Sequence, residues 1–246
     1  MKRVLADLLA TIFGFFLSPV LVFLARRRVS LVMFQRLADR MGFQIRSTHY
    51  YEPTYAEADL PADTTGERDL PGVALNEAAQ LQLLETFVFA DELRAIPLDK
   101  RNDSSFGYRN NMYSFGDAEI YYSMIRRMKP RRIIEIGAGN STLIAQLAIK
   151  ANRNDDPAYK CVQVCVEPYE AAWLAAFDVE LIRKRVEDVD LALFETLEAG
   201  DVLFIDSSHA IRPFGDVLRE FHQIIPRIAP GVLIQVDDIF GAYIPA

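Results

Sequence analysis

The chain is short of cysteine and of strongly basic segments, and each shortage excludes a class of function. Its two cysteines, Cys161 and Cys165, lie four positions apart in one expected strand, too far apart for an easy disulfide. We therefore expect two reduced thiols in a cytosolic domain. The 246 residues carry a net charge of −7, and no basic stretch is interleaved with aromatic residues. General nucleic-acid binding is disfavoured.

Charge is absent from a long run near the N-terminus. Residues 8–25 (LLATIFGFFLSPVLVFLA) would span about 27 Å as a helix, just enough for a bilayer core. Three arginines, residues 26–28, follow directly, so the positive-inside rule keeps the rest of the chain cytoplasmic. Pro19 and Asp7 weaken the spanning interpretation, and the alternative is a hydrophobic helix packed on the domain or on a partner protomer. We expect residues 1–28 to form a membrane anchor.

The next segment, residues 29–100, is predicted to be helical and linker. Residues 29–50 have the spacing of an amphipathic helix near a membrane surface. Residues 51–75 are rich in turn formers and predict a loop, and residues 76–95 predict another helix. The polar and aromatic stretch at 97–116 is either a lid over a small-molecule site or a plain surface loop.

From residue 101 to 246 the pattern predicts one α/β domain. A helix is expected over 117–128, and strands are expected at 131–136, 160–167, 179–186, 201–206 and 231–237. Helices are predicted from residue 140 onwards and over 191–197 and 213–228. Strands alternating with helices indicate a doubly wound, mostly parallel, Rossmann-like sheet.

A glycine turn follows the first of these strands. Gly137, Ala138 and Gly139 separate the strand from Asn140 and Ser141, which are good helix starters. Strand, glycine turn and helix in this order form the ligand-binding corner of a Rossmann-like unit. A dinucleotide fingerprint would have a third glycine where this chain has threonine. That difference disfavours a nicotinamide-dependent oxidoreductase, which remains an alternative.

Acidic residues mark the turn and the ends of two further strands. Glu135 precedes the glycine turn, where a carboxylate suits a cationic ligand. Glu167 ends the second strand and could accept hydrogen bonds from ribose hydroxyls, or be a solvated strand-end acid. Asp206, Ser207 and His209 belong to an Asp-Ser-Ser-His run after the fourth strand. The histidine could take a proton from an acceptor hydroxyl or amine, or merely cap the helical region that follows.

The runs E-I-G-A-G-N-S-T, E-P-Y and D-S-S-H together resemble class I S-adenosylmethionine-dependent methyltransferases. The likeness covers roughly residues 108–240 and is strongest to a small bacterial branch, the family 24 methyltransferase domain. It implies transfer of a methyl group from S-adenosylmethionine to an oxygen or nitrogen of a small-molecule acceptor. It also implies catalytic roles for His209 and Asp206. The implied cofactor-binding residues are Glu135, Gly137, Ala138, Gly139, Asn140, Ser141, Glu167, Asp188 (chosen over Glu187), Asp206 and Ser207.

Two departures from the family pattern affect the acceptor side. Asp237 stands where that branch has histidine, and with Asp206 and Asp238 it resembles the acidic set of catechol-type enzymes that hold magnesium. We favour polar lining of an acceptor pocket over a metal site. The chain also ends before strands six and seven of the family fold, so we expect either another protomer over the fifth strand or a shortened, impaired enzyme. A non-catalytic S-adenosylmethionine-binding or scaffold protein at the membrane remains an alternative.

Overall fold

The computed structural model describes residues 2–27, 30–46, 72, 74–169 and 172–238. The chain forms two compact units, one of residues Met1–Glu67 with Tyr243–Ala246 and one of residues Arg68–Ala242. Most of the predicted loop at 51–75 lies outside the described residues, as does everything after residue 238. The three-part division at 28 and 100 stays a prediction, although the unit that contains the sheet begins well before residue 101.

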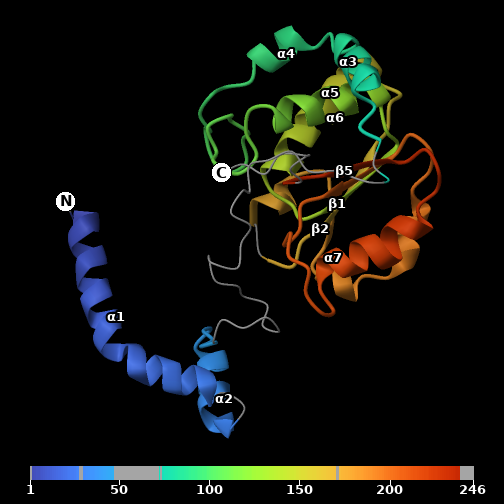
Figure 1. The fold of residues 1–246 in the computed structure, drawn as a ribbon. Helices are drawn as coiled ribbons and strands as arrows, with labels where there is room; N and C mark the ends of the chain where they lie inside the picture. Colours follow the sequence, from blue (N-terminus) through green and yellow to red (C-terminus); the bar gives the residue numbers. More distant parts are fainter. Residues whose placement is uncertain (1, 28–29, 47–71, 73, 170–171, 239–246) are drawn as a thin grey trace. The chain divides into compact units, whose positions relative to one another are not determined.

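The larger unit is built on a five-stranded parallel sheet (Figure 1). Its strand order is β3-β2-β1-β4-β5, which confirms the predicted doubly wound architecture. The crossover between β3 and β4 places the ends of β1 and β4 side by side at the centre of the sheet. The strands are β1 (Arg132–Ile136), β2 (Val162–Val166), β3 (Glu180–Ile182), β4 (Val202–Ile205) and β5 (Leu233–Val236).

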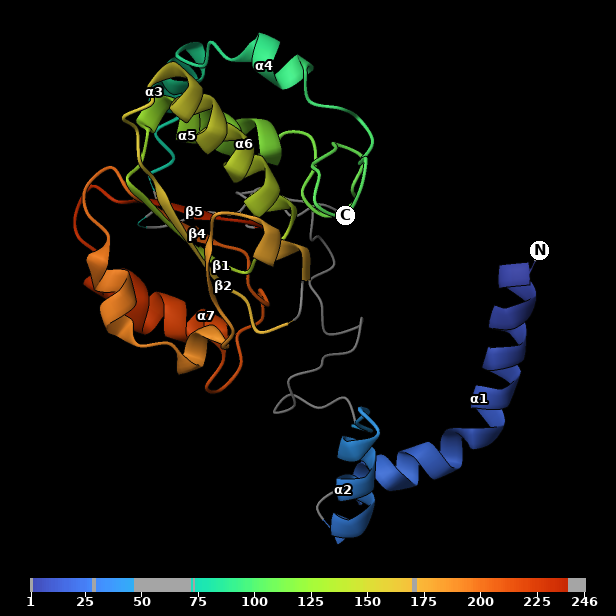
Figure 2. The same cartoon turned by 180° about the vertical axis from the view of Figure 1, so that it is seen from behind.

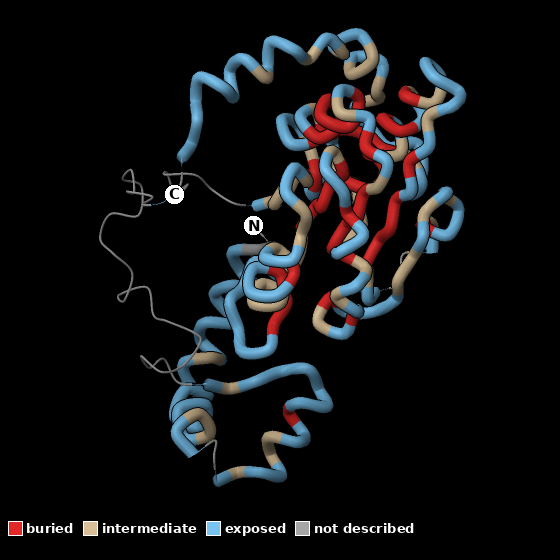
Figure 3. The backbone as a smooth tube through the Cα atoms, turned by 90° about the vertical axis from the view of Figure 1, so that its right-hand side faces the viewer, coloured by how far each residue is buried: buried red, intermediate tan, exposed pale blue. Residues whose placement is uncertain are grey.

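Helices cover both faces of this sheet (Figures 1 and 2). Helices α5 (Asp117–Met128) and α6 (Asn140–Asp155) pack on one face, and α7 (Asp216–Arg219) lies on the other. Alternate residues of β1 divide between the two cores, with Ile133 in the α5–α6 cluster and Ile134 in the other. Because both faces are covered, the central strands are apolar almost throughout and buried (Figure 3).

Four predicted elements of the larger unit differ from those observed. The predicted helix at 76–95 is two helices, α3 (Glu77–Glu85) and α4 (Ala90–Arg94). The strand predicted over 179–186 is only three residues long, because its second half is charged and leaves the sheet. The helix predicted over 213–228 is composite. After α7 it becomes a π turn, Glu220–Ile224, and then a 3₁₀ turn, Ile225–Arg227, whose proline cannot continue the helical hydrogen bonding. The short helix predicted at 191–197 is a 3₁₀ helix, η5 (Leu191–Thr196).

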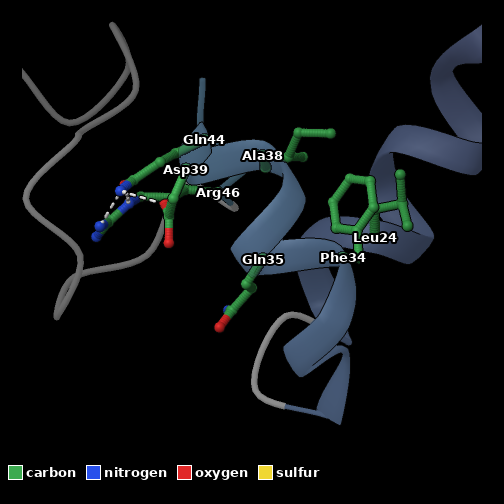
Figure 4. Close-up of a pocket in the computed structure, with 8 residues that line it drawn as sticks. Leu24, Phe34, Gln35, Ala38, Asp39, Gln44 and Arg46 are labelled. Atoms are coloured by element: carbon green, nitrogen blue, oxygen red, sulfur yellow. Dashed lines mark hydrogen bonds between the residues drawn. The ribbon is translucent and has the colours of Figure 1, made fainter. Parts of the chain in front are cut away.

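The smaller unit contains α1 (Lys2–Arg26) and α2 (Val32–Arg40). Among the described residues, one helical stretch, Val4–Arg26, is long and apolar enough to cross a membrane, and none of it is buried. Helix α2 is shorter than the helix predicted over residues 29–50. Together α1 and α2 border a cavity of about 390 Å³ (Figure 4). Leu24 and Phe34 line it on one side, and Gln44 donates to Asp39 (3.5 Å) on the other.

A buried arginine joins α4 to the two helices on the sheet. Arg126 is 5% exposed, and its Nε and Nη2 donate to Glu92 of α4 at 2.7 and 2.8 Å. Nη2 also donates to Asp155 of α6 (2.7 Å), and Nη1 donates to the buried Asn152. The guanidinium lies 4.9 Å from the Phe89 ring centre. Arg126 lowers the pKa of Glu92, as expected for a charged pair held by hydrogen bonds.

We expect Arg126→Met to lower the free energy of unfolding by about 2–3 kcal/mol, because the buried Asn152 oxygen loses its charged donor. The exposed neighbour supplies the control, since Arg127→Met should change stability by less than about 0.5 kcal/mol. Urea unfolding followed by circular dichroism measures both. Equal losses in the two variants would show that the network does not stabilise the domain.

Candidate functional site

The carboxyl ends of β1, β2 and β4 meet at one edge of the sheet. The glycine turn follows β1, Glu167 follows β2, and Asp206 follows β4. A cavity of about 340 Å³ lies at this edge, and Gly137, Glu167 and Asp206 are among the residues that line it. Ligands of open α/β sheets bind at such an edge. The structure therefore brings together the three strand ends on which the sequence interpretation depends.

The two glycines of the turn have different roles. Gly137 has φ +85°, and a Cβ built there would lie 1.9 Å from the carbonyl oxygen of Asp206. Only glycine allows this approach. Its amide donates to the Val166 carbonyl (3.0 Å), which ties the turn to β2. A Cβ on Gly139 would meet no atom within 4 Å. The second glycine thus faces the open space beside the turn, where a ligand can approach the backbone.

The start of α6 explains the threonine that replaces a third glycine. The amide of Gly139 donates to Oγ1 of Thr142 (3.1 Å), whose side chain is fully buried. The side chain of Asn140 donates to Asn110 Oδ1 (3.1 Å), and Ser141 is buried in the first turn. The predicted helix starters therefore fasten the turn to the core and to the loop at 97–116. The role of this loop as a lid stays a prediction.

Glu167 holds the glycine turn from the neighbouring strand. Its Oε2 accepts a hydrogen bond from the amide of Ala138 (3.1 Å), and its Oε1 accepts one from the amide of Tyr169 (2.8 Å). Each carboxylate oxygen has a second lone pair that can accept from a ligand. Glu167 is thus placed to bind hydroxyl groups in the cavity while it fixes the backbone of the turn.

Glu135 lies beneath the turn. Its side chain is fully buried, and its Oε2 accepts from Gln163 (2.7 Å) and lies 3.4 Å from the sulfur of Cys165. Burial raises the pKa of Glu135 to about 7, although its polar neighbours, Thr142 first among them, act in the opposite direction. The geometry makes this acid a support of the turn. Its contact with a ligand stays a prediction.

The structure also places the two acids after β3 differently. Asp188 pairs with Arg185 at 3.1 Å and is largely solvated, whereas Glu187 lines the cavity with its side chain 14% exposed. The adenine-binding role that the family resemblance implied for Asp188 stays a prediction, and Glu187 is the acid of this pair that lines the cavity. Adjacent acids in one 3₁₀ turn, Val186–Asp188, cannot be ranked from sequence, because their directions depend on the backbone.

His209 and the acids of the acceptor side come together. The ring Nε2 of His209 lies 3.2 Å from Asp206 Oδ1 and 3.9 Å from Asp238 Oδ2. Burial raises the pKa of Asp206, and the hydrogen bond with His209 opposes that rise. The pKa of Asp237 is raised to about 6, first by burial and then by the charges of Asp206 and Asp238. Within the described part of the chain, no group of three or more His, Cys, Asp or Glu side chains is arranged to hold a metal ion. The magnesium alternative therefore gains no support from the structure.

Residues after β4 complete the cavity wall, and the sequence does not predict most of them. Ser208 and Arg212 of the loop and Asp216 of α7 line the cavity together with the predicted Ser207. The Asp-Ser-Ser-His run points to the serines. It does not point to their acidic partners, which lie eight and thirteen positions further along the chain.

Comparison with known proteins shows which domain family the sheet-containing unit resembles. Residues 134–239 match the model of a family described as a methyltransferase domain. An uncharacterised protein of Archaeoglobus fulgidus is 35% identical over 139 residues, which cover 54% of this chain. The chain spans 61% of the length of that relative.

Two solved structures are more weakly similar to this chain. One is a Plasmodium falciparum protein assigned as a protein-L-isoaspartate O-methyltransferase, in complex with S-adenosyl-L-homocysteine. It is 12% identical with a TM-score of 0.32, over 50% of this chain and 60% of that one. The other is the MycE methyltransferase of mycinamycin biosynthesis, with magnesium, S-adenosylhomocysteine and mycinamycin VI. It is 15% identical with a TM-score of 0.37, over 68% of this chain and 49% of that one. At these TM-scores neither structure carries an argument, so the similarity to methyltransferases rests on the family match over residues 134–239.

We predict different outcomes for a valine substitution at each of the two glycines. Gly139→Val should weaken binding of S-adenosylhomocysteine at least about tenfold in a folded protein, because the branched side chain enters open space that the ligand needs. Gly137→Val should fail to fold, because its Cβ collides with the Asp206 carbonyl. Calorimetry and thermal melts measure the two effects. Unchanged affinity in Gly139→Val would remove the basis for a ligand at this turn.

Proposed function

We propose that the class I S-adenosylmethionine-dependent methyltransferase domain of this chain transfers a methyl group to an oxygen or nitrogen of a small-molecule acceptor. The observation that carries this proposal is the cavity at the sheet edge, where the glycine turn, Glu167 and Asp206 line one space. The family match over residues 134–239 supports the same reaction class.

The residues at the cavity suit S-adenosylmethionine. The volume of about 340 Å³ is within the usual range for small-molecule sites. The free lone pairs of Glu167 can accept both ribose hydroxyls, and Glu187 can accept the adenine amino group. The open side of Gly139 lets the ligand approach the backbone. When bound, the cofactor would supply a methyl group activated by a sulfonium charge, which the surrounding carboxylates favour electrostatically.

On the acceptor side, the protein's contribution is alignment and removal of one proton. Asp206 lies where the cavity wall meets His209, so it can orient the imidazole ring through their 3.2 Å contact. With Nε2 donating to the Asp206 carboxylate, Nδ1 of His209 is the ring nitrogen left to accept a proton from the acceptor hydroxyl or amine. Holding donor and acceptor in line supplies the remaining rate enhancement by proximity.

The N-terminal helix has the role of a membrane anchor in this proposal, with the methyltransferase domain on the cytoplasmic side. The helix α1 leaves large apolar side chains exposed, among them Phe13, Phe15 and Phe16. Exposed apolar surface of this extent needs a cover. A lipid bilayer supplies one, and the arginines after the helix favour the cytoplasmic side.

For catalysis, we expect His209→Ala to lower turnover by roughly 10²–10⁴-fold with little change in affinity for S-adenosylmethionine, because the ring faces the acceptor. The exposed His222 is a matched control, and His222→Ala should keep normal turnover. The assay follows labelled methyl transfer to amines and phenols found by screening. Full activity of His209→Ala at neutral pH would assign the proton transfer to Asp206 or solvent. A loss of activity with EDTA would revive the metal alternative.

For the anchor, removing residues 1–28 should move the protein from the membrane fraction to the soluble fraction, because the apolar helix supplies the insertion energy. A second variant keeps the segment but places charge within it. Leu9→Glu with Phe16→Glu should also lower the membrane-bound share. A full-length protein that is already soluble, and precipitates after the deletion, would instead indicate a helix packed on protein.

A further inference from the structure

Two serine–carboxylate pairs hold the loop after β4. Ser208 donates twice to Asp216, from its amide to Oδ2 (2.8 Å) and from its hydroxyl to Oδ1 (2.7 Å). The preceding Ser207 donates from its hydroxyl to Glu220 Oε2 (3.2 Å). Asp216 and Glu220 are four residues apart, so they lie on one side of the same helical segment. Two consecutive loop residues are therefore fastened to one helix.

The next residue of the loop is His209, which has an unusual backbone. Its φ is 55°, in the left-handed region that is strained for a residue with a Cβ. Such a conformation persists only where surrounding contacts impose it. Ser207 and Ser208, the two residues held by the carboxylates, directly precede the histidine. The ring Nε2 of His209 lies 3.2 Å from Asp206 Oδ1.

Burying the carboxylate of Glu220 costs desolvation free energy, so its position calls for an explanation. Its side chain is fully buried, and its Oε1 has no hydrogen-bond partner within the described part of the chain. Burial raises its pKa to about 7, although the hydrogen bond from Ser207 opposes the rise. It is also the first residue of the π turn, a feature frequent at functional sites.

We propose that Asp216 and Glu220 are positioning residues, which hold Ser208 and Ser207 so that the left-handed His209 directs its ring to Asp206. The kinetic consequence rests on the proposed methyl transfer, whereas the position of the ring does not. The Ser208–Asp216 and Ser207–Glu220 pairs should respond differently when the carboxylate is replaced by an amide. Asparagine at 216 keeps one acceptor oxygen for two donors, whereas glutamine at 220 keeps the acceptor that Ser207 needs.

The test combines a structural readout with kinetics on the full chain. The chain has three histidines, so the ring resonance of His209 is assigned by its loss in His209→Ala. The variants are Asp216→Asn, Glu220→Leu and Glu220→Gln. Asp201→Asn is the matched control. Asp201 is also a buried carboxylate that accepts backbone amides, from Arg131 and Arg132, but at the opposite end of the strands.

We expect the His209 resonance to shift in Asp216→Asn and Glu220→Leu, with kcat lowered about tenfold or more and KM for S-adenosylmethionine changed much less. In Glu220→Gln, unlike Glu220→Leu, kcat should stay within about twofold of the wild-type value. Asp201→Asn should lower stability without moving the resonance.

An unmoved His209 resonance in Asp216→Asn would overturn the proposal, as would a Glu220→Gln variant as impaired as Glu220→Leu. If Glu220→Leu does not fold, Ser207→Ala replaces it with the same expected shift. If the resonance moves as expected while wild-type protein binds no S-adenosylhomocysteine and transfers no methyl group, the positioning holds and the proposed function fails.

Discussion

The site depends on one close approach, between the backbone of Gly137 and the carbonyl of Asp206. With no side chain at residue 137, the turn after β1 can pass directly over the end of β4. The Gly137 amide bonds to Val166 at the end of β2, and the Asp206 amide bonds to Ile136 at the end of β1. Three strand ends are thereby locked into one surface. The cavity, the start of α6 and the orientation of Asp206 all follow from that contact.

Buried acids support this surface from both sides of the sheet. Glu135 lies on the side of α5 and α6, and Glu220 lies on the side of α7, and burial raises the pKa of each to about 7. A raised folded-state pKa gives stability that is fully present below the unfolded pKa and is lost as the pH rises through about 7. Near neutral pH both acids therefore reduce stability. Glu135 lies beneath the glycine turn, and Glu220 accepts a hydrogen bond from Ser207 in the loop that contains His209.

Features set by short-range patterns were predictable from sequence. The five strands and the glycine turn follow from apolar runs and from Gly137, and the structure confirms them. The choice between Asp188 and Glu187 was not predictable, because it depends on the direction of each side chain in a 3₁₀ turn. The break between α3 and α4 was not predictable from the sequence, because residues 86–89 continue the apolar pattern of a helix while their backbone is not helical.

The donor and acceptor sides of the site have different physical origins. The donor side is built from strand ends whose register in the sheet fixes them, so its chemistry is visible in short motifs. The acceptor side depends on a loop that contains left-handed His209 and Phe214 and is held by side chains from α7 and the π turn. Because those contacts join separate segments, no local motif encodes them. The short motifs at the sheet edge therefore predict a reaction class, whereas recognition of the proposed acceptor depends on contacts that form only in the folded chain.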